Sequence, residues 1–230
     1  MYDVLVARQL ITIHDPIAHK SMTDQVSEKL RSMILSRQLE PGLRVTQVEL
    51  AEMLGVSTMP IREALLRLGA EGLIVAASGR SFEIAATTKD GIRDVYWAHG
   101  MLAGELAARA WDKRSEELLG TLRDEHTAYY AALERGEHGS LTEINRRFHA
   151  AINSVAASPT LGVLLRNTMH YFPDFSLTAP GWVELASRWQ SSLIKEFTDG
   201  DRDGVRRVSV DCSREAGDLF IDAYWSSADA

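Results

Sequence analysis

The stretch GVSTMPIREALLRLGAEGLI, residues 55–74, has the apolar spacing of a single amphipathic helix. Ser57 is a candidate N-cap, and Pro60 falls in the first turn, where its missing N–H costs little. The pattern predicts that the helix ends near residues 69–72, at a pair of glycines. Its first two turns are polar and carry Arg62, so the helix is suited to present hydroxyls and a guanidinium to a partner.

A second, shorter helix is predicted immediately upstream, over Thr46–Leu54. Thr46 and Glu49 have the spacing of a capping box, and Gly55 can take the positive φ of a tight turn. Two short helices joined by such a turn predict a helix-turn-helix. Ala51 allows the two helices to approach closely, and the residues expected to lock the pair together are Leu50, Leu54, Val56, Ile61 and Ala64.

With those side chains inward, Thr58, Met59 and Arg62 remain outward. In such motifs the first turns of the second helix meet base edges in the major groove, where arginine pairs with guanine. Two short alternating strands follow, in LIVAAS and SFEIAA, and they predict a hairpin about Gly79 and Arg80 that forms a wing. The alternative is a helical hairpin packed in a core, with Arg62 merely solvated.

The residues LEPGLRVTQVELAEMLGVSTMPIREALLRLGAEGLIV carry several anchors at fixed spacing. They resemble the winged-helix domain of GntR-family bacterial transcription regulators, over about residues 22–86. The resemblance implies that Arg44 and Arg62 contact DNA, but Thr58 replaces a usual arginine and Ser81 a usual wing glycine. The full candidate DNA-contact set is Arg44, Thr46, Ser57, Thr58, Met59, Arg62, Gly79 and Arg80.

Composition and charge limit the classes of protein. The 230 residues have a net charge of −7, but residues 1–85 carry only −1 of it, so a local basic face on the first part is compatible with nucleic-acid binding. No apolar run approaches the ~20 residues of a membrane span, and the start lacks a secretory signal pattern. A single cysteine, Cys212, fits a reducing compartment. We therefore expect a cytoplasmic protein without a membrane partner.

After residue 88 the strand signals stop and helical patterns take over. The predicted helices cover residues 90–111, 115–135, 140–155, 159–170, 180–199 and 202–225. The predicted fold is mainly α, an N-terminal winged helix-turn-helix followed by an all-α bundle. The expected limits are an arm at 1–21, the winged helix at 22–86, a linker at 87–89 and the bundle at 90–225.

Polar residues interrupt the apolar stripes of this bundle. The five such positions are His99, Asn145, His149, Gln190 and Cys212. Buried polar groups need partners, so their convergence would indicate a small polar cavity for an effector. Taken alone, a buried histidine is more often a satisfied core residue, and Cys212 is more often a small hydrophobe than a ligand contact.

The second half, including NRRFHAAI, resembles the FCD-type effector domain of the fatty-acid-regulator subgroup, over about residues 90–225. Many members bind a divalent metal through an Asp or Asn four residues before a His, plus two later His. Asn145 and His149 match the first pair, whereas Gln190 and Cys212 occupy the later positions, and His99 replaces an arginine that engages acidic effectors. A metal is therefore less expected than in relatives. If one is present, the ligands would be Asn145, His149 and Cys212, and His126 or His170 could complete such a site.

These features predict a homodimeric transcription regulator without enzymatic activity. Two winged helices would bind a roughly palindromic double-stranded operator, and a small-molecule effector, an organic acid among the candidates, would control that affinity. Two alternatives stay open. One is an architectural DNA-binding dimer without an effector. The other is an enzyme fused to a DNA-binding module, with His149 as base and Cys212 as nucleophile.

Overall fold

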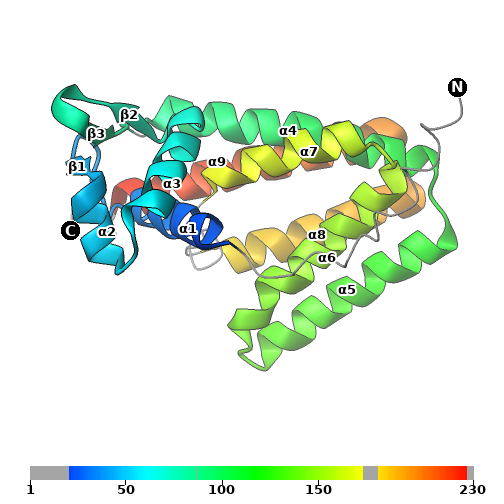
Figure 1. Cartoon of the computed structure of the whole chain (residues 1–230). Helices are drawn as coiled ribbons and strands as arrows, with labels where there is room; N and C mark the ends of the chain where they lie inside the picture. The colour runs from blue at the N-terminus through cyan, green and yellow to red at the C-terminus, as the bar shows by residue number, and fades with distance from the viewer. Residues whose placement is uncertain (1–20, 87, 173–180, 227–230) are drawn as a thin grey trace, which may run out of the picture.

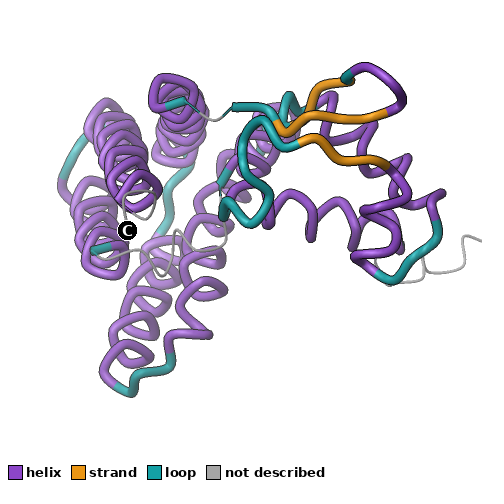
Figure 2. Tube along the Cα trace, turned by 90° about the vertical axis from the view of Figure 1, so that its left-hand side faces the viewer, coloured by secondary structure: helices purple, strands orange, loops and turns teal. Residues whose placement is uncertain are grey.

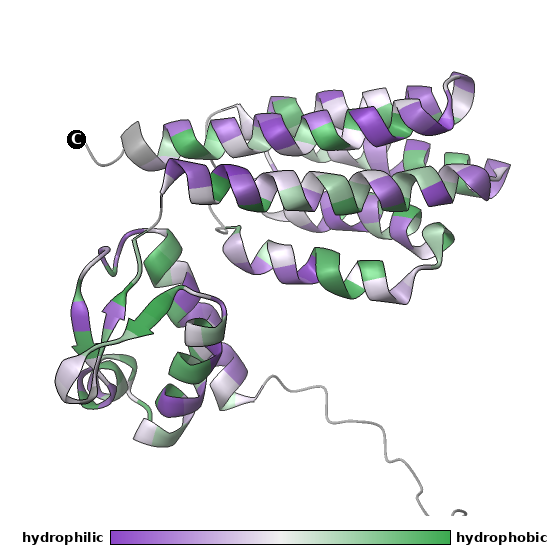
Figure 3. Cartoon of the chain, turned by 90° about the horizontal axis from the view of Figure 1, so that it is seen from above, coloured by the Kyte–Doolittle hydropathy of each residue, from purple (hydrophilic) through white to green (hydrophobic). Residues whose placement is uncertain are grey.

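A computed structural model describes residues 21–86, 88–172 and 181–226. The chain forms a small domain with three strands and a larger, wholly helical domain beside it, as Figures 1 and 3 show. Of the predicted arm at residues 1–21, residues 1–20 lie outside the described residues, and Ser21 is the N-cap of the first helix. The predicted mainly α architecture, a winged helix followed by a bundle, is confirmed.

The first domain contains the predicted helix-turn-helix. Its elements are α1 (Met22–Leu35), β1 (Arg44–Thr46), α2 (Gln47–Leu54), α3 (Thr58–Ala70), β2 (Ile74–Ala76) and β3 (Ser81–Ile84). The strands form one antiparallel sheet in the order β1-β3-β2, which stays within this domain (Figure 2). The sequence did not predict β1, because three residues next to a Pro-Gly break are too short to show alternation.

The turn between α2 and α3 forms as expected. Gly55 is the C-cap of α2 with φ 66°, and Thr46 and Glu49 make the capping box at its start. Ile61 and Ala64 are fully buried on the inner face of α3. They join a core built from α1, α2, α3 and the sheet, so the orientation of α3 is fixed by its apolar side.

The second domain is a bundle of long helices. Its elements are α4 (Lys89–Asp112), α5 (Glu116–Glu134), α6 (His138–Ala156), α7 (Pro159–Thr168), the 3₁₀ turn η2 (Met169–Tyr171), α8 (Trp182–Asp199) and α9 (Arg202–Ser226). The starts and ends agree with the predicted helices to within a few residues. Helices α4 and α9 lie side by side (Figure 1). A Cβ at Gly100 would lie 2.9 Å from the Ser213 Cβ, so this glycine permits the close approach.

The bundle has an apolar interior. Leu106, Phe148 and Phe197 are fully buried in its main cluster. Among the described residues, no helix is long and apolar enough to cross a membrane.

Candidate DNA-reading surface and effector pocket

The first two turns of α3 present a polar, accessible surface. Ser57, Thr58 and Arg62 are exposed, and the Met59 side chain is 73% exposed. Ser57 is the N-cap of α3 but makes no side-chain capping bond. Within the described part of the chain, Arg62 has no hydrogen bond or ion pair. Its five N–H donors are therefore available to an external acceptor.

The remaining DNA-contact candidates differ in whether their polar groups are already bonded within the protein. Arg44 is exposed, but its Nε lies 3.2 Å from Glu83 Oε2 on the neighbouring strand. The Thr46 hydroxyl is engaged with Glu49 in the capping box. Gly79, in a 3₁₀ turn (η1, Ser78–Arg80), has φ 75° at the tip of the wing. The side chain of Arg80 lies outside the described atoms, so its role stays a prediction.

Ser81 takes the position where the resemblance predicts a wing glycine. Its backbone is extended, at φ −97° and ψ 165°, which any residue adopts. Its hydroxyl donates to the Ser78 carbonyl oxygen at 2.7 Å. The wing therefore forms a short hydrogen-bonded turn without glycine at this position.

In the bundle, His99 on α4 is paired with the end of α7. Its Nδ1 lies 2.8 Å from Thr168 Oγ1, and the Thr168 hydroxyl donates to the Leu165 carbonyl oxygen at 2.7 Å. Because that hydroxyl has one proton, the hydrogen bond from His99 requires Nδ1–H as the donor. The lone pair on His99 Nε2 then remains as an acceptor. His149 lies close enough for the two rings to interact electrostatically.

Gln190 joins three helices through a chain of hydrogen bonds. It is 1% exposed, and its Nε2 donates to Asn145 Oδ1 at 3.0 Å. Its Oε1 lies 3.0 Å from His126 Nδ1, and His126 Nε2 lies 3.0 Å from Ser191 Oγ. A consistent arrangement has His126 donating from Nδ1 and accepting at Nε2. Both polar atoms of the Gln190 amide are thereby bonded, whereas the amide donors of Asn145 have no partner among the described residues.

Burial sets the charge of the candidate pocket. It lowers the pKa of His99 to about 4, with a smaller contribution from His149, and it lowers the pKa of His149 to about 4 as well. Burial also raises the pKa of Cys212 to about 12; Glu215 adds to that shift and Arg188 opposes it. Near neutral pH both imidazoles and the thiol are therefore uncharged.

The donor set does not fit a tightly held divalent metal. Gln190 is committed to Asn145 and His126, and the Oδ1 of Asn145, the atom that would ligate a metal, accepts a hydrogen bond from Gln190 instead. Across the described ranges, no three His, Cys, Asp or Glu side chains are grouped to hold a metal ion. His126 is bonded to Gln190, and His170 lies 3.9 Å from Glu71 Oε1 in the first domain. Neither is arranged to complete a site.

Sequence reasoning missed three participants. The Thr168 hydroxyl is bonded to His99 and orients its ring, and the Ser191 hydroxyl is bonded to His126 at the end of the chain of hydrogen bonds from Gln190. Neither could be predicted, because a single hydroxyl on a helix gives no distinctive sequence pattern. Phe172 stacks on Tyr96 with ring centroids 4.4 Å apart, and it lies 4.8 Å from the His99 ring. Phe172 lies just beyond the helix predicted at residues 159–170, where the sequence shows no helical pattern.

The two domains meet at the C-terminal end of α3. Glu71 is the C-cap of α3, and Tyr171 in η2 donates from its hydroxyl to the Glu71 carbonyl oxygen at 2.8 Å. The Glu71 carboxylate is held by Arg31 at 2.7 and 2.9 Å. A separate contact places the Arg37 guanidinium 4.4 Å from the centre of the Tyr224 ring. Helix α3 is thus anchored to the bundle at the end opposite Arg62.

A helix-turn-helix with an exposed, unpaired arginine, a wing and an appended bundle defines the class of DNA-binding transcription regulators. Comparison with known proteins gives the family. Residues 22–84 match the model of bacterial regulatory proteins of the gntR family, and residues 94–212, just over half of the chain, match the FCD domain. The chain belongs to the GntR family and carries an FCD effector-binding domain.

Individual relatives agree with this assignment. The chain is 29% identical over 143 residues to the HTH-type transcriptional regulator McbR of Escherichia coli, covering 62% of this chain and 65% of McbR. It is 24% identical over 187 residues to the uncharacterized HTH-type regulator YdhC of Bacillus subtilis, covering 80% of this chain and 84% of YdhC.

Solved structures have the same architecture. The structure of E. coli McbR/YncC superimposes with a TM-score of 0.61 at 25% identity, covering 91% of this chain and all of that one. A GntR family member from Pseudomonas syringae gives a TM-score of 0.53 at 22% identity, covering 90% of this chain and 87% of that one, and shows the fold alone.

Proposed function

We propose that this transcription regulator reads its operator with the first two turns of α3. The observation that carries the proposal is that Arg62 is exposed and unpaired among the described residues, beside the free hydroxyls of Ser57 and Thr58. A guanidinium placed there can pair bidentately with a guanine. Arg44, Gly79 and Arg80 would contact the sugar-phosphate backbone or the minor groove, and Thr46 would stabilise the start of α2.

The effector is proposed to bind among His99, Asn145, His149 and Cys212, with Gln190 holding Asn145 in place. Among the described residues, the groups without a hydrogen-bond partner are the Nε2 acceptor of His99, the amide donors of Asn145, and the ring nitrogens of His149. Since both imidazoles are neutral, they fit a molecule that both donates and accepts hydrogen bonds. An organic acid would bind most easily in its protonated form, because the donor set offers it no cation.

The coupling between the two sites is proposed to pass through α7 and η2. Thr168, at the end of α7, is bonded to His99, and three residues later Tyr171 is bonded to the C-cap of α3. An effector that displaces His99 would therefore move a short, continuous segment that ends on the recognition helix. A coupling of ~1–3 kcal/mol suffices to change operator occupancy several-fold.

The regulator is proposed to act as a homodimer in the cytoplasm, where operator DNA is found. Trp97 is 65% exposed and Met101 46% exposed one turn apart on α4, an apolar surface suited to a second copy. We further propose the domain limits as an arm at 1–21, the winged helix at 22–86, a linker at 87–89 and the bundle at 90–225.

The enzyme alternative is disfavoured by the chemistry of Cys212. A nucleophilic cysteine reacts as a thiolate, whereas burial holds this thiol neutral. The other alternative, an architectural DNA-binding dimer without an effector, assigns no role to the unpaired polar groups around His99. We therefore propose effector binding without catalysis.

The experiment is an anisotropy titration of operator DNA with Arg62→Ala. We expect a loss of about 1–3 kcal/mol in specific affinity, the cost of one bidentate base contact. Arg67→Ala is the matched control, because Arg67 is an exposed arginine on the same helix that is paired with Asp24. Equal affinity of the Arg62→Ala variant and the parent would refute the assignment of α3 as the reading helix.

A further inference from the structure

Met59, in the first turn of α3, points away from the protein. The buried residues of α3 are Ile61, Ala64, Leu65 and Leu68. Met59 is two residues before Ile61, which turns it by about 200° and so to the opposite side of the helix. Its side chain is 73% exposed and takes no part in the apolar core of the described winged helix. Whatever α3 binds with its outward face must therefore meet this thioether side chain.

Met59 and Arg62 are neighbours on the exposed surface of α3. Residues three apart on a helix lie side by side, and they are separated by about 4.5 Å along its axis. Base pairs are stacked roughly 3.4 Å apart. A helix that places Arg62 on a guanine therefore brings Met59 to a base pair one or two steps away. A single exposed methionine is ordinary on a protein surface, but at this position it has a defined partner.

The base edges in the major groove decide what Met59 can bind. Guanine and adenine present acceptors there, adenine and cytosine present amino donors, and thymine presents an acceptor and its C5 methyl group. A thioether has no hydrogen to donate, and its sulfur is only a weak acceptor. On a purine or a cytosine, Met59 would cover polar groups without bonding them, which costs free energy. Thymine alone offers it an apolar group to pack against.

We propose that Met59 determines part of the operator sequence by packing on the C5 methyl group of a thymine, one or two base pairs from the guanine that Arg62 contacts. The inference rests on the proposed function, because it takes α3 to be the reading helix. It deepens that function by adding a second base to the recognised sequence. Helix α3 then combines a hydrogen-bonded contact from Arg62 with an apolar contact from Met59.

The test starts from a DNA duplex that the full chain selects from a random-sequence library. Each thymine of that duplex is replaced in turn by deoxyuridine, which removes only the methyl group and keeps the base pair. At one thymine in each half-site, we expect the replacement to weaken binding by about fourfold, the value of one buried methyl group. Met59→Ala should bind the thymine and deoxyuridine duplexes equally. Met59→Leu, which keeps an apolar side chain, should retain the preference for thymine.

Leu66→Ala is the control for Met59→Ala. Leu66 is 65% exposed and lies on the same side of α3, but about two turns further from the start of the helix. The Leu66→Ala variant should keep the full preference for thymine. Both replacements change exposed side chains, so neither removes a contact from the core of the winged helix.

Two results would overturn the inference: a parent protein that loses no affinity at any deoxyuridine, and a loss that is equally large in Met59→Ala. The Arg62→Ala titration separates this failure from failure of the proposed function. If Arg62→Ala weakens operator binding whereas deoxyuridine does not, α3 reads the operator without Met59. If the library yields no preferred duplex, sequence reading itself fails and the inference about Met59 fails with it.

Discussion

The Tyr171 hydroxyl donates a hydrogen bond, 2.8 Å long, to the backbone carbonyl oxygen of Glu71. The two residues are one hundred positions apart and belong to different domains. Tyr171 also packs against the core of the winged helix. It nevertheless belongs to the bundle domain, where it lies three residues after Thr168, the last residue of α7. The end of the recognition helix is therefore attached to the segment that contacts His99.

Tyr171→Phe should weaken this attachment while leaving the ring in place. We expect a loss of about 1 kcal/mol in the free energy that couples the domains, the net value of one hydrogen bond. Differential scanning calorimetry should then show the two domains unfolding at more widely separated temperatures. Tyr130→Phe, at an exposed position on α5, is the control. An unchanged calorimetric profile in Tyr171→Phe would show that the bond does not couple the domains.

Thr58→Arg should restore a charge at the exposed start of α3, where the GntR resemblance places an arginine. One additional phosphate contact steepens the slope of log affinity against log salt by about 0.9. The slope is measured by anisotropy titrations of operator DNA at salt concentrations between roughly 50 and 200 mM. A stronger but equally salt-dependent complex would indicate a base contact rather than a phosphate contact.

Gly55 and Gly120 make a matched pair for backbone conformation. Both have open space where a Cβ would stand, but Gly55 has φ 66° whereas Gly120 lies within α5. Gly55→Ala should lower the free energy of unfolding by about 1 kcal/mol, because L-residues strain in the left-handed region. Gly120→Ala should raise it by about 0.5–1 kcal/mol. Urea unfolding measures both, and destabilisation of equal size would contradict the conformational explanation.

The helix-turn-helix could be predicted because its signals are local. The capping residues Thr46 and Glu49, the turn at Gly55 and the periodicity of α3 all lie within a few residues of one another. Strand β1 could not be predicted because its three residues form a strand only by pairing with β3, which is nearly forty residues away in the sequence. Burial of Ile61 and exposure of Arg62 followed from periodicity alone and are confirmed.

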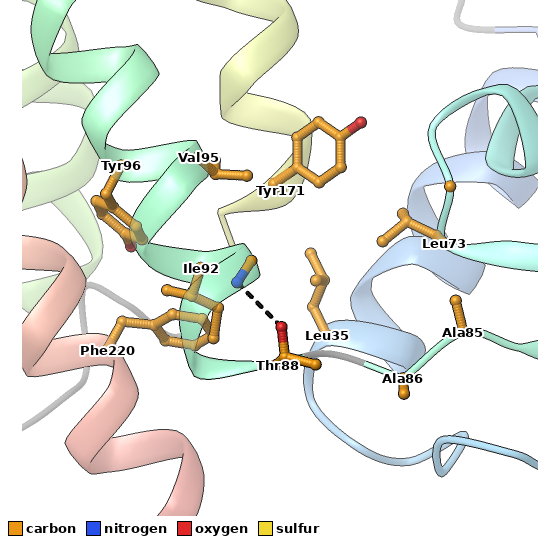
Figure 4. Close-up of a pocket in the computed structure, with 12 residues that line it drawn as sticks. Leu35, Leu73, Ala85, Ala86, Thr88, Ile92, Val95, Tyr96, Tyr171 and Phe220 are labelled. Carbon is orange, nitrogen blue, oxygen red and sulfur yellow. Dashed lines mark hydrogen bonds between the residues drawn. The ribbon is translucent and has the colours of Figure 1, made fainter.

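The candidate effector residues of the bundle could be predicted only as a set. Periodicity places His99, Asn145 and His149 on inward faces, but it says nothing of which atoms pair across helices. The bond from His99 to Thr168 and the use of Gln190 by His126 depend on how α4, α5, α7 and α8 are stacked. A cavity between the domains, lined by Leu73, Ile92 and Tyr171 among others (Figure 4), had no sequence signal, because its wall is assembled from short segments of both domains.

The neutral histidines of the bundle predict how stability depends on pH. The ordinary histidine pKa near 6.5 applies to the unfolded chain, whereas His99 and His149 have pKa values of about 4 when folded. Between these values the unfolded state binds more protons, so stability is complete above pH 6.5 and is lost as the pH falls towards 4. From pH 7 to pH 5 each histidine should remove about 2 kcal/mol of stability.

Urea unfolding at the two pH values measures this loss. His99→Gln and His149→Gln should each reduce the loss between pH 7 and pH 5 by about half, because each leaves the other partly buried imidazole to titrate. His138→Gln is the control, since His138 is exposed. That window lies above the range where carboxylates protonate, so acidic groups contribute little to it. Equal losses in all three variants and the parent would mean that the bundle histidines are solvated, and the effector pocket would then lack the neutral acceptor assigned to His99.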